Sequence, residues 1–351
     1  MSKLGKLFLG AFIILLAGII VFALKPKPAL IPGNPSPAPV TNYSPPTTTL
    51  FLAGDIMLSR NVAGRMIKNN DYTWPFQKTT DVSKNADIAF ANLESPFNDT
   101  GNHSVEGSLV FNADPKSIEG LKFAGFDILS TANNHAFDQG QKGLDYTIQL
   151  LQNNGIIPTG TLSSTQPPPV PVIKRNGTLY GFLSYSYTAY NDGGKSTSRY
   201  IKNYNDFSQL KQDILDMKGH TADVVIVNMH AGTEYTRKPT QKQIDFAHAA
   251  VDAGADLVIG EHPHWVQTIE QYKGKWIFYS LGNFVFDQMW SQETREGLTL
   301  LVTFEKNEIK KIELKPVIID DLCCPRWAND QETKTILQKI NLTSPILLQH
   351  N

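Results

Sequence analysis

The sequence is poor in cysteine and has no surplus of charge of either sign. Its 351 residues include two cysteines, the adjacent Cys323 and Cys324, so a disulfide framework of the kind that holds small secreted domains together is excluded. A disulfide between neighbours closes a strained ring, so ordinary disulfide geometry is not expected. Lys and Arg number 32 against 33 Asp and Glu, a formal net charge of −1. The chain therefore lacks the basic surplus that nucleic-acid binding requires, and nucleic acid is not an expected partner.

One long apolar run stands at the N-terminus. Residues Leu7–Leu24 form an uncharged run of 18 residues, preceded by Lys3 and Lys6. As a helix this run would span about 27 Å, close to the hydrocarbon thickness of a bilayer. We expect residues 1–24 to form an uncleaved single-pass anchor in the cell membrane, with the rest of the chain extracytoplasmic. A cleaved signal peptide is the alternative.

Proline is concentrated in the following segment, residues 25–47. Such a segment forms neither a helix nor a central strand, which predicts an extended linker between the membrane and the rest of the chain. From residue 48 to about 320, strand-like runs alternate with helical patterns, and this mixture predicts a layered α/β or α+β domain. Residues 321–351 are a C-terminal extension of that domain.

The predicted elements follow from apolar periodicity and turn signals. Two hairpins are expected, one over 170–186 with its turn at Asn176-Gly177 and one over 297–319. The remaining strands are predicted at 48–58, 86–94, 126–135, 221–230, 254–264 and 276–286, and the helices at 115–124, 140–153, 204–217 and 239–253.

A side chain able to bind a metal ion follows each of five apolar strands. These residues are Asp55, Glu94, the pair Asn134 and His135, His230, and the pair His262 and His264. Ligands of open α/β sheets bind outside the carboxyl ends of the strands, so we expect these side chains to share one cleft. Each residue alone is better explained as a turn, solvated or hydrogen-bonded residue, but the recurrence at five strand ends favours a metal site. Carboxylate, amide and imidazole together suit Mn, Fe or Zn, and one or two divalent ions are expected.

Five other residues have two interpretations each. Asp138 either orients the imidazole of His135 or caps the next helix. Arg60 either holds an anionic substrate group or lies on the surface. Glu234, Asn283 and Asp287 are expected to line the substrate pocket, and ordinary turn or edge positions are their simpler interpretation.

Six motifs resemble, in order, those of CapA-type proteins, which are associated with poly-γ-glutamate capsule synthesis in bacteria. They are GDIMLSR (54–60), ANLESPF (91–97), ANNHAFDQG (132–140), NMHAGTEY (228–235), GADLVIGEHPHWVQ (254–267) and SLGNFVFDQ (280–288). The resemblance covers roughly residues 48–320. It implies a relationship to the calcineurin-like metallophosphoesterases and hence a β-sandwich flanked by helices on both outer faces, an αββα fold.

The resemblance also implies roles for individual residues. Asp55 matches the first metal aspartate and Glu94 the position of the bridging acidic group. Asn134 would bind metal and His135 would meet the leaving group of the substrate, while His230, His262 and His264 match the later metal histidines. Met57 departs from the phosphoesterase pattern, because it stands where an Asp-x-His motif has histidine. One ligand is therefore missing or replaced.

Two functions follow from these expectations. The first is a metal-dependent hydrolase that acts on a phosphoester or a γ-glutamyl amide, with His135 as general acid. The second is a non-catalytic accessory subunit that binds a polyanionic polymer during its synthesis and export. Both imply contact with the membrane, with an anionic polymer or phosphoester, and with polymer synthase or export subunits.

Overall fold

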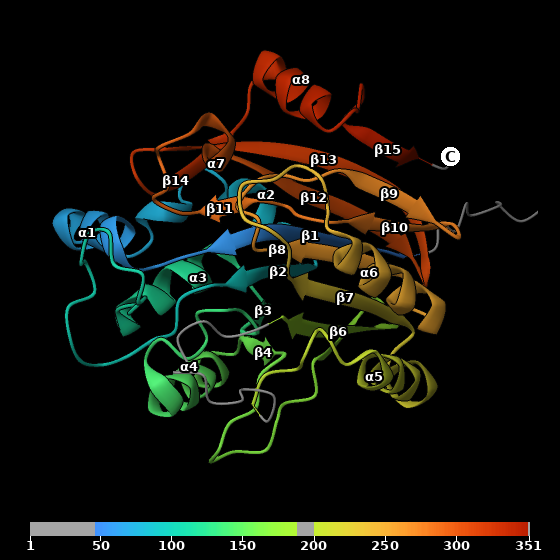
Figure 1. The fold of residues 1–351 in the computed structure, drawn as a ribbon, viewed down its shortest axis with the longest axis horizontal. Helices are drawn as coiled ribbons and strands as arrows, with labels where there is room; N and C mark the ends of the chain where they lie inside the picture. The colour runs from blue at the N-terminus through green and yellow to red at the C-terminus, as the bar shows by residue number, and fades with distance from the viewer. Residues whose placement is uncertain (1–45, 188–199, 350–351) are drawn as a thin grey trace, which may run out of the picture. The chain divides into compact units, whose positions relative to one another are not determined.

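Two β-sheets packed face to face form the centre of the fold (Figure 1). The computed structural model describes residues 46–187 and 200–349, and residues 45–351 cluster as one unit. The predicted anchor, its signal-peptide alternative and nearly all of the predicted linker lie outside the described residues. In the part of the chain that is described, no helix is both long and apolar enough to cross a bilayer.

The first sheet combines a parallel half and an antiparallel half. Its strand order is β14-β13-β12-β1-β2-β3-β4, with β11 also paired to β1 and β15 to β13. The parallel strands are β1 (Thr47–Ile56), β2 (Ile88–Leu93), β3 (Ile128–Ser130), β4 (Ile157–Thr159) and β11 (Asn283–Val285). The antiparallel strands are β12 (Glu296–Glu305), β13 (Glu308–Asp320), β14 (Cys324–Trp327) and β15 (Ile346–Gln349).

The second sheet has the order β5-β6-β7-β8-β10-β9. Its parallel centre consists of β6 (Thr178–Ser186), β7 (Val224–His230), β8 (Leu257–Glu261) and β10 (Lys275–Phe278). The edges, β5 (Val172–Arg175) and β9 (Ile269–Tyr272), are antiparallel to their neighbours. The predicted turn at Asn176-Gly177 joins β5 to β6, and both of its residues have positive φ, as a tight hairpin turn requires.

Alternate residues of the central strands meet between the sheets. Leu52 and Phe90 of the first sheet share one buried cluster with Phe182 and Ile226 of the second. The rings of Phe90 and Phe182 stack across the interface with centroids 5.4 Å apart. Because side chains alternate along a strand, the remaining residues of these buried strands face outward and need a cover of helices.

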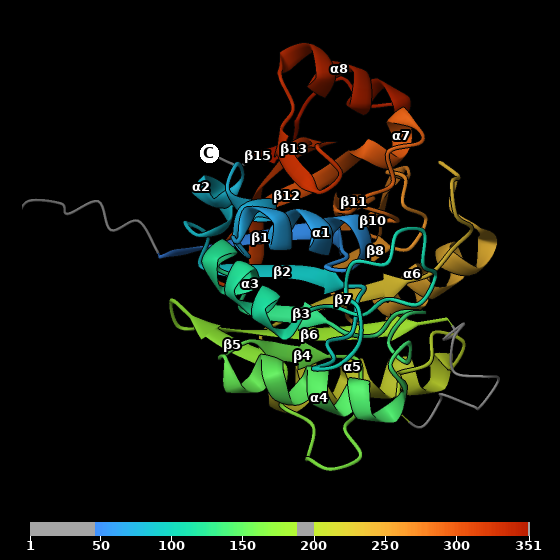
Figure 2. The same cartoon turned by 90° about the vertical axis from the view of Figure 1, so that its left-hand side faces the viewer.

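Helices supply that cover on both outer faces (Figure 2). Helices α1 (Arg60–Asn69) and α3 (Ile118–Ala124) pack on the first sheet, and α5 (Phe207–His220) and α6 (Gln241–Ala253) pack on the second. The other helices are α2 (Thr80–Ser83), α4 (Gly140–Asn153), α7 (Gln292–Arg295) and α8 (Asp330–Lys339), with 3₁₀ turns at Trp74–Phe76 and Pro115–Ser117. The helix–sheet–sheet–helix order confirms the layered αββα class.

Two predicted segments differ from the structure. The strand expected over 276–286 is two strands in different sheets, because Gly282 (φ 68°) turns the chain from β10 to β11. The helix expected over 115–124 begins as a 3₁₀ turn and becomes α-helical at Ile118. The adjacent Cys323 and Cys324 are joined as a disulfide; Cys323 ends the turn after β13, Cys324 begins β14, and both are buried.

Candidate metal centre and active site

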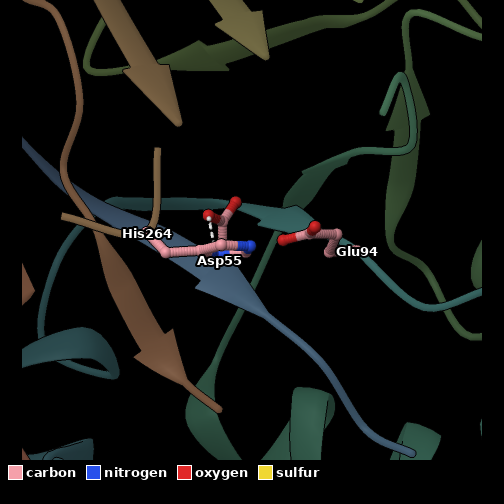
Figure 3. A group of neighbouring side chains, drawn as sticks. All are labelled: Asp55, Glu94 and His264. Atoms are coloured by element: carbon pink, nitrogen blue, oxygen red, sulfur yellow. Dashed lines mark ion pairs between the residues drawn. The ribbon is translucent and has the colours of Figure 1, made fainter. Parts of the chain in front are cut away.

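Side chains from both sheets meet beyond the carboxyl ends of β1, β2, β7 and β8. One ligand atom from each of Asp55, Glu94 and His264 lies within 4.8 Å of the others, and all three residues are buried (Figure 3). Asn134, His230 and His262 contact this group through the distances given below. The structure thus brings together all six residues that the sequence suggested as metal ligands.

Asp55, near the end of β1, is held in place by hydrogen bonds to its backbone and to its carboxylate. Its N–H donates to the carbonyl of Gly282 at 3.0 Å, in the turn that leads into β11. The carboxylate accepts hydrogen bonds from Asn92 Nδ2 at 2.8 Å and from the backbone N–H of His262 at 3.3 Å. Its Oδ2 atom lies 3.5 Å from His264 Nδ1. Asp55 therefore connects the first sheet to the loop after β8.

Glu94 is a fully buried carboxylate with no hydrogen-bond partner on either oxygen among the described residues. Its backbone N–H donates to the carbonyl of Ile56 at 2.8 Å, which directs the residue toward Asp55. Burial, and then repulsion from Asp55 and Glu234, raise the pKa of Glu94 well above its ordinary value. A buried carboxylate without partners is costly, and a cation beside it would remove that cost.

His230 links the carboxylates to Asn134. Its Nδ1 atom lies 3.7 Å from Asp55 Oδ1, and its Nε2 atom lies 2.8 Å from Asn134 Oδ1 and 3.9 Å from Glu94 Oε1. Burial lowers the pKa of this imidazole well below its ordinary value, and the neighbouring histidines add to the effect. The ring is therefore neutral at physiological pH, the form in which histidine binds a metal.

His262 and His264 flank Pro263 in a constrained loop. Both have positive φ, 94° and 58°, a conformation that non-glycine residues rarely adopt outside functional sites. His262 Nδ1 is buried and has no hydrogen-bond partner among the described residues, and burial lowers the pKa of this residue to about 3. His264 Nδ1 lies 2.9 Å from Asn283 Oδ1, which fixes the orientation of its ring.

These residues fit a divalent cation. The donors are carboxylate oxygens, an amide oxygen and neutral imidazoles, and the orphaned oxygens of Glu94 and the orphaned Nδ1 of His262 face no other described partner. Asp55, Glu94 and His264 would hold the ion, with His230, His262 and Asn134 adjacent. When bound, such an ion supplies Lewis-acid polarisation of a phosphoryl or carbonyl oxygen and lowers the pKa of water.

His135 and Asp138 form a second pair beside this cluster. His135 Nδ1 lies 2.8 Å from Asp138 Oδ2, and His135 Nε2 lies 3.8 Å from Glu94 Oε1. The imidazole stacks on the ring of Phe111, with centroids 3.9 Å apart. Of the two interpretations of Asp138, the structure shows the orienting one, because the N-cap position of α4 is Gln139.

A cavity of about 610 Å³ opens next to this pair. It is lined by Leu109, Asn134, His135, Tyr187, Gly232, Thr233, Glu234, Tyr235 and His262. Glu234 therefore lines this cavity, and its role in binding a substrate stays a prediction.

Arg60, Asp287 and Asn283 do not line the cavity. Arg60 forms an ion pair with Asp287, and its guanidinium lies 4.9 Å from the centroid of the Phe111 ring. Asp287 also accepts hydrogen bonds from the backbone and side chain of Asn61. Asn283 contacts His264. The three residues thus contact side chains around the site, and a direct role in substrate binding stays a prediction.

Sequence reasoning missed three residues of the site. Asn92 bonds to Asp55, and Asn133 donates to Asn92 Oδ1 at 3.2 Å. Glu261 is fully buried beside His262, and burial, followed by repulsion from Asp55, raises its pKa. Strand periodicity could have found Asn92, which lies two positions before Glu94 and so shares its side of the strand.

Fold and site together define a two-sheet αββα protein with a buried carboxylate–imidazole cluster that could hold a divalent cation. Residues 49–288 match the family described as bacterial capsule synthesis protein PGA_cap. The chain belongs to this family. It is 31% identical to the PGA biosynthesis protein CapA of Bacillus subtilis, over 87% of this chain and 80% of that protein.

Two further relatives extend the comparison. The chain is 31% identical to the capsule biosynthesis protein CapA of Bacillus anthracis, over 81% of this chain and 70% of that protein. It is 25% identical to a Mycobacterium tuberculosis protein named "Probable polyglutamine synthesis accessory protein", over 67% of this chain and 65% of that protein.

Proposed function

We propose that this protein is a membrane-anchored, extracytoplasmic, metal-dependent hydrolase of capsule or poly-γ-glutamate biosynthesis. Its substrate is a phosphoester or a γ-glutamyl amide. The names of the Bacillus relatives support the biosynthetic context. The apolar run Leu7–Leu24 supports the anchor. Polymer synthase or export subunits are the proposed protein partners.

The observation that carries the catalytic proposal is the juxtaposition of two clusters. Asp55, Glu94 and His264 place ligand atoms within 4.8 Å of one another, and the Nε2 atom of His135 lies 3.8 Å from Glu94. An acid–base group beside a divalent-cation site is the arrangement that hydrolysis of a phosphoester or an amide needs. Manganese, iron or zinc is the proposed ion, because imidazoles take part in its binding.

In such a reaction His135, Asp138 and Phe111 would each have a separate role. Asp138 Oδ2 accepts a hydrogen bond from the Nδ1–H of His135, which leaves Nε2 to face the cavity. The protonated ring would donate from Nε2 to the leaving oxygen or nitrogen of the substrate. Stacking on Phe111 covers one face of the imidazole and holds it at this angle.

Metal analysis and hydrolysis assays on the full-length chain test the proposal. We expect the purified protein to bind Mn²⁺ or Zn²⁺ and to hydrolyse a generic phosphodiester or a γ-glutamyl amide. Asp55→Asn and His264→Ala should each lose the metal and the activity. Asp145→Asn is the matched control, because this carboxylate lies within α4 and accepts hydrogen bonds from Ser163 and Ser164. Metal binding that is intact in both site variants would contradict the proposed centre.

A second function, a non-catalytic accessory subunit, is favoured by two observations. Met57 occupies the position of a metal histidine in the phosphoesterase pattern, and the Mycobacterium relative is named as an accessory protein. In this case the site binds the carboxylates of an anionic polymer without cleaving it. Tight metal and polymer binding with no turnover of either substrate class would favour this function over hydrolysis.

A further inference from the structure

One buried carboxylate near the metal cluster has no cation to neutralise it. Glu261 ends strand β8 and is fully buried. Its Oε2 atom accepts a hydrogen bond from Asn228 Nδ2 at 2.6 Å, whereas its Oε1 atom has no hydrogen-bond partner. Within residues 46–187 and 200–349, no Lys, Arg or His forms an ion pair with it.

The position of Glu261 makes it part of the environment of Asp55. It is paired in register with His230 on the neighbouring strand β7. The next backbone N–H, that of His262, donates to Asp55 Oδ2, and the charges of Asp55 and Glu261 are close enough to repel. Leu257 and Ile259 lie on the same side of β8, in the core between the sheets. Glu261 thus lies directly beneath the cluster, on the side of that core.

The buried carboxylates around the site suggest how Glu261 affects cation binding. Asp55, Glu94 and Glu261 are all fully buried carboxylates, and Arg60, whose charge reaches Glu94, is already paired with Asp287. A cation bound here would favour the ionised form of these buried carboxylates, and each ionised carboxylate would in turn attract the cation. Glu261 is not a member of the Asp55–Glu94–His264 group, so it would act through its charge and not as a ligand.

We propose that Glu261 is a positioning carboxylate of the metal centre that raises its affinity for divalent cations. The inference rests on the proposed metal centre and assigns to this chain a determinant of cation affinity outside the ligand set.

Glu261→Gln tests the effect of the charge alone, because glutamine has nearly the same size and shape as glutamate. The amide keeps an oxygen that can accept from Asn228 and removes the negative charge. We expect the dissociation constant for Mn²⁺, measured by calorimetry on the full-length chain, to rise about 10- to 100-fold, the range found for residues around metal ligands. The melting temperature without metal should stay the same or rise, because repulsion of Asp55 is removed. The stabilisation by Mn²⁺ should shrink.

Two further variants make the test specific. Glu261→Asp keeps the charge and should bind Mn²⁺ more tightly than Glu261→Asn, a comparison that remains available if the Gln variant does not fold. Ser184→Ala removes a buried hydroxyl that lacks a hydrogen-bond partner in the part of the chain that is described. Ser184 lies in register with Asn228 and carries no charge. The variant should leave Mn²⁺ affinity unchanged.

The outcomes distinguish this inference from the proposed function. If wild type binds Mn²⁺ and folded Glu261→Gln binds it equally well, the role of Glu261 is wrong while the metal centre stands. Equal affinities for the Asp and Asn variants would overturn it as well. If wild type binds no divalent ion, both the metal centre and the role of Glu261 are overturned.

Discussion

The Nδ1 atom of His135 lies 2.8 Å from the carboxylate of Asp138, three residues further along the chain. The same carboxylate accepts the backbone N–H of Phe111, on whose ring the imidazole stacks. Asp138 therefore contacts the Nδ1 edge of the His135 ring directly and also fixes the backbone of Phe111, whose ring covers one face of the imidazole. The orientation of the ring is determined before any substrate enters the cavity.

This arrangement predicts the effects of removing its two members. His135→Asn should lower kcat by about 10²- to 10⁴-fold, the usual contribution of a general acid. Asp138→Asn should lower kcat less, because the ring is retained but is free to adopt the wrong tautomer. Both variants should bind Mn²⁺ like wild type in calorimetry, since neither residue belongs to the ligand cluster. A kcat unchanged in His135→Asn would exclude it as the acid.

Asn283 orients His264 and so should control metal affinity indirectly. Asn283→Ala removes the acceptor 2.9 Å from His264 Nδ1, and loss of such a partner typically weakens metal binding about 10- to 100-fold. The measurement is the dissociation constant for Mn²⁺. Asn154→Ala, at the end of α4, is the control and should leave it unchanged. Equal affinity of Asn283→Ala and wild type would show that the loop alone holds His264.

Gly54 leaves no room for a side chain where β1 passes the turn before β11. A Cβ atom at this position would collide with the backbone carbonyl of Gly282, which cannot move without shifting β11. We expect Gly54→Ala to destabilise the protein by about 2–4 kcal/mol in denaturant unfolding and to weaken Mn²⁺ binding through displacement of Asp55. Gly64→Ala on α1, where the nearest atom would be 3.8 Å away, should cause no such loss.

The ion pair of Arg326 with Glu332 predicts a specific dependence on acid. The pair lowers the pKa of Glu332 to about 2, from an ordinary value of 4.5. Its contribution to stability is therefore present above pH 4.5 and is lost as the pH falls toward 2. Both side chains are partly exposed, so the effect should stay below about 1 kcal/mol.

The test compares melting temperatures across that window. Arg326→Gln should melt below wild type at pH 6, and the difference should shrink steadily as the pH falls to 2.5. Lys334→Gln, which removes an exposed charge from the same helix, should show no difference that depends on pH in this way. A constant difference for Arg326→Gln from pH 6 to pH 2.5 would contradict the assignment.

Local sequence signals predicted the buried centre of the fold well. The hairpin turn at Asn176-Gly177 and helix α4 over 140–153 lie where the sequence placed them, because turn chemistry and apolar periodicity are local properties. The short strand β4 and helix α8 were missed, because three residues, or a mostly polar helix, carry little periodic signal. The two strands within 276–286 could not be separated either, since the sheet that each joins depends on distant partners.

In the candidate site, too, the sequence predicted what depends on local residues and missed what depends on distant ones. Residue types at strand ends predicted which side chains converge, since parallel strands bring their carboxyl ends to one edge. The hydrogen-bond and ion-pair partners of the side chains around the site could not be predicted. Arg60 and Asp287 are 227 positions apart, and nothing local indicates that they neutralise each other. Glu261 gave no signal because a lone glutamate before a histidine is ordinary in composition and is unusual only once it is known to be buried.

Strand β13 has a practical consequence for protein production. Its 13 residues are bordered on one side by β12 and on the other by β14 and β15, both of which come from the C-terminal segment. A truncation after residue 320 would strip that second side of its hydrogen-bonding partners. The bared edge would be a template for strands of other molecules, so shortened versions should precipitate where the intact chain remains monodisperse.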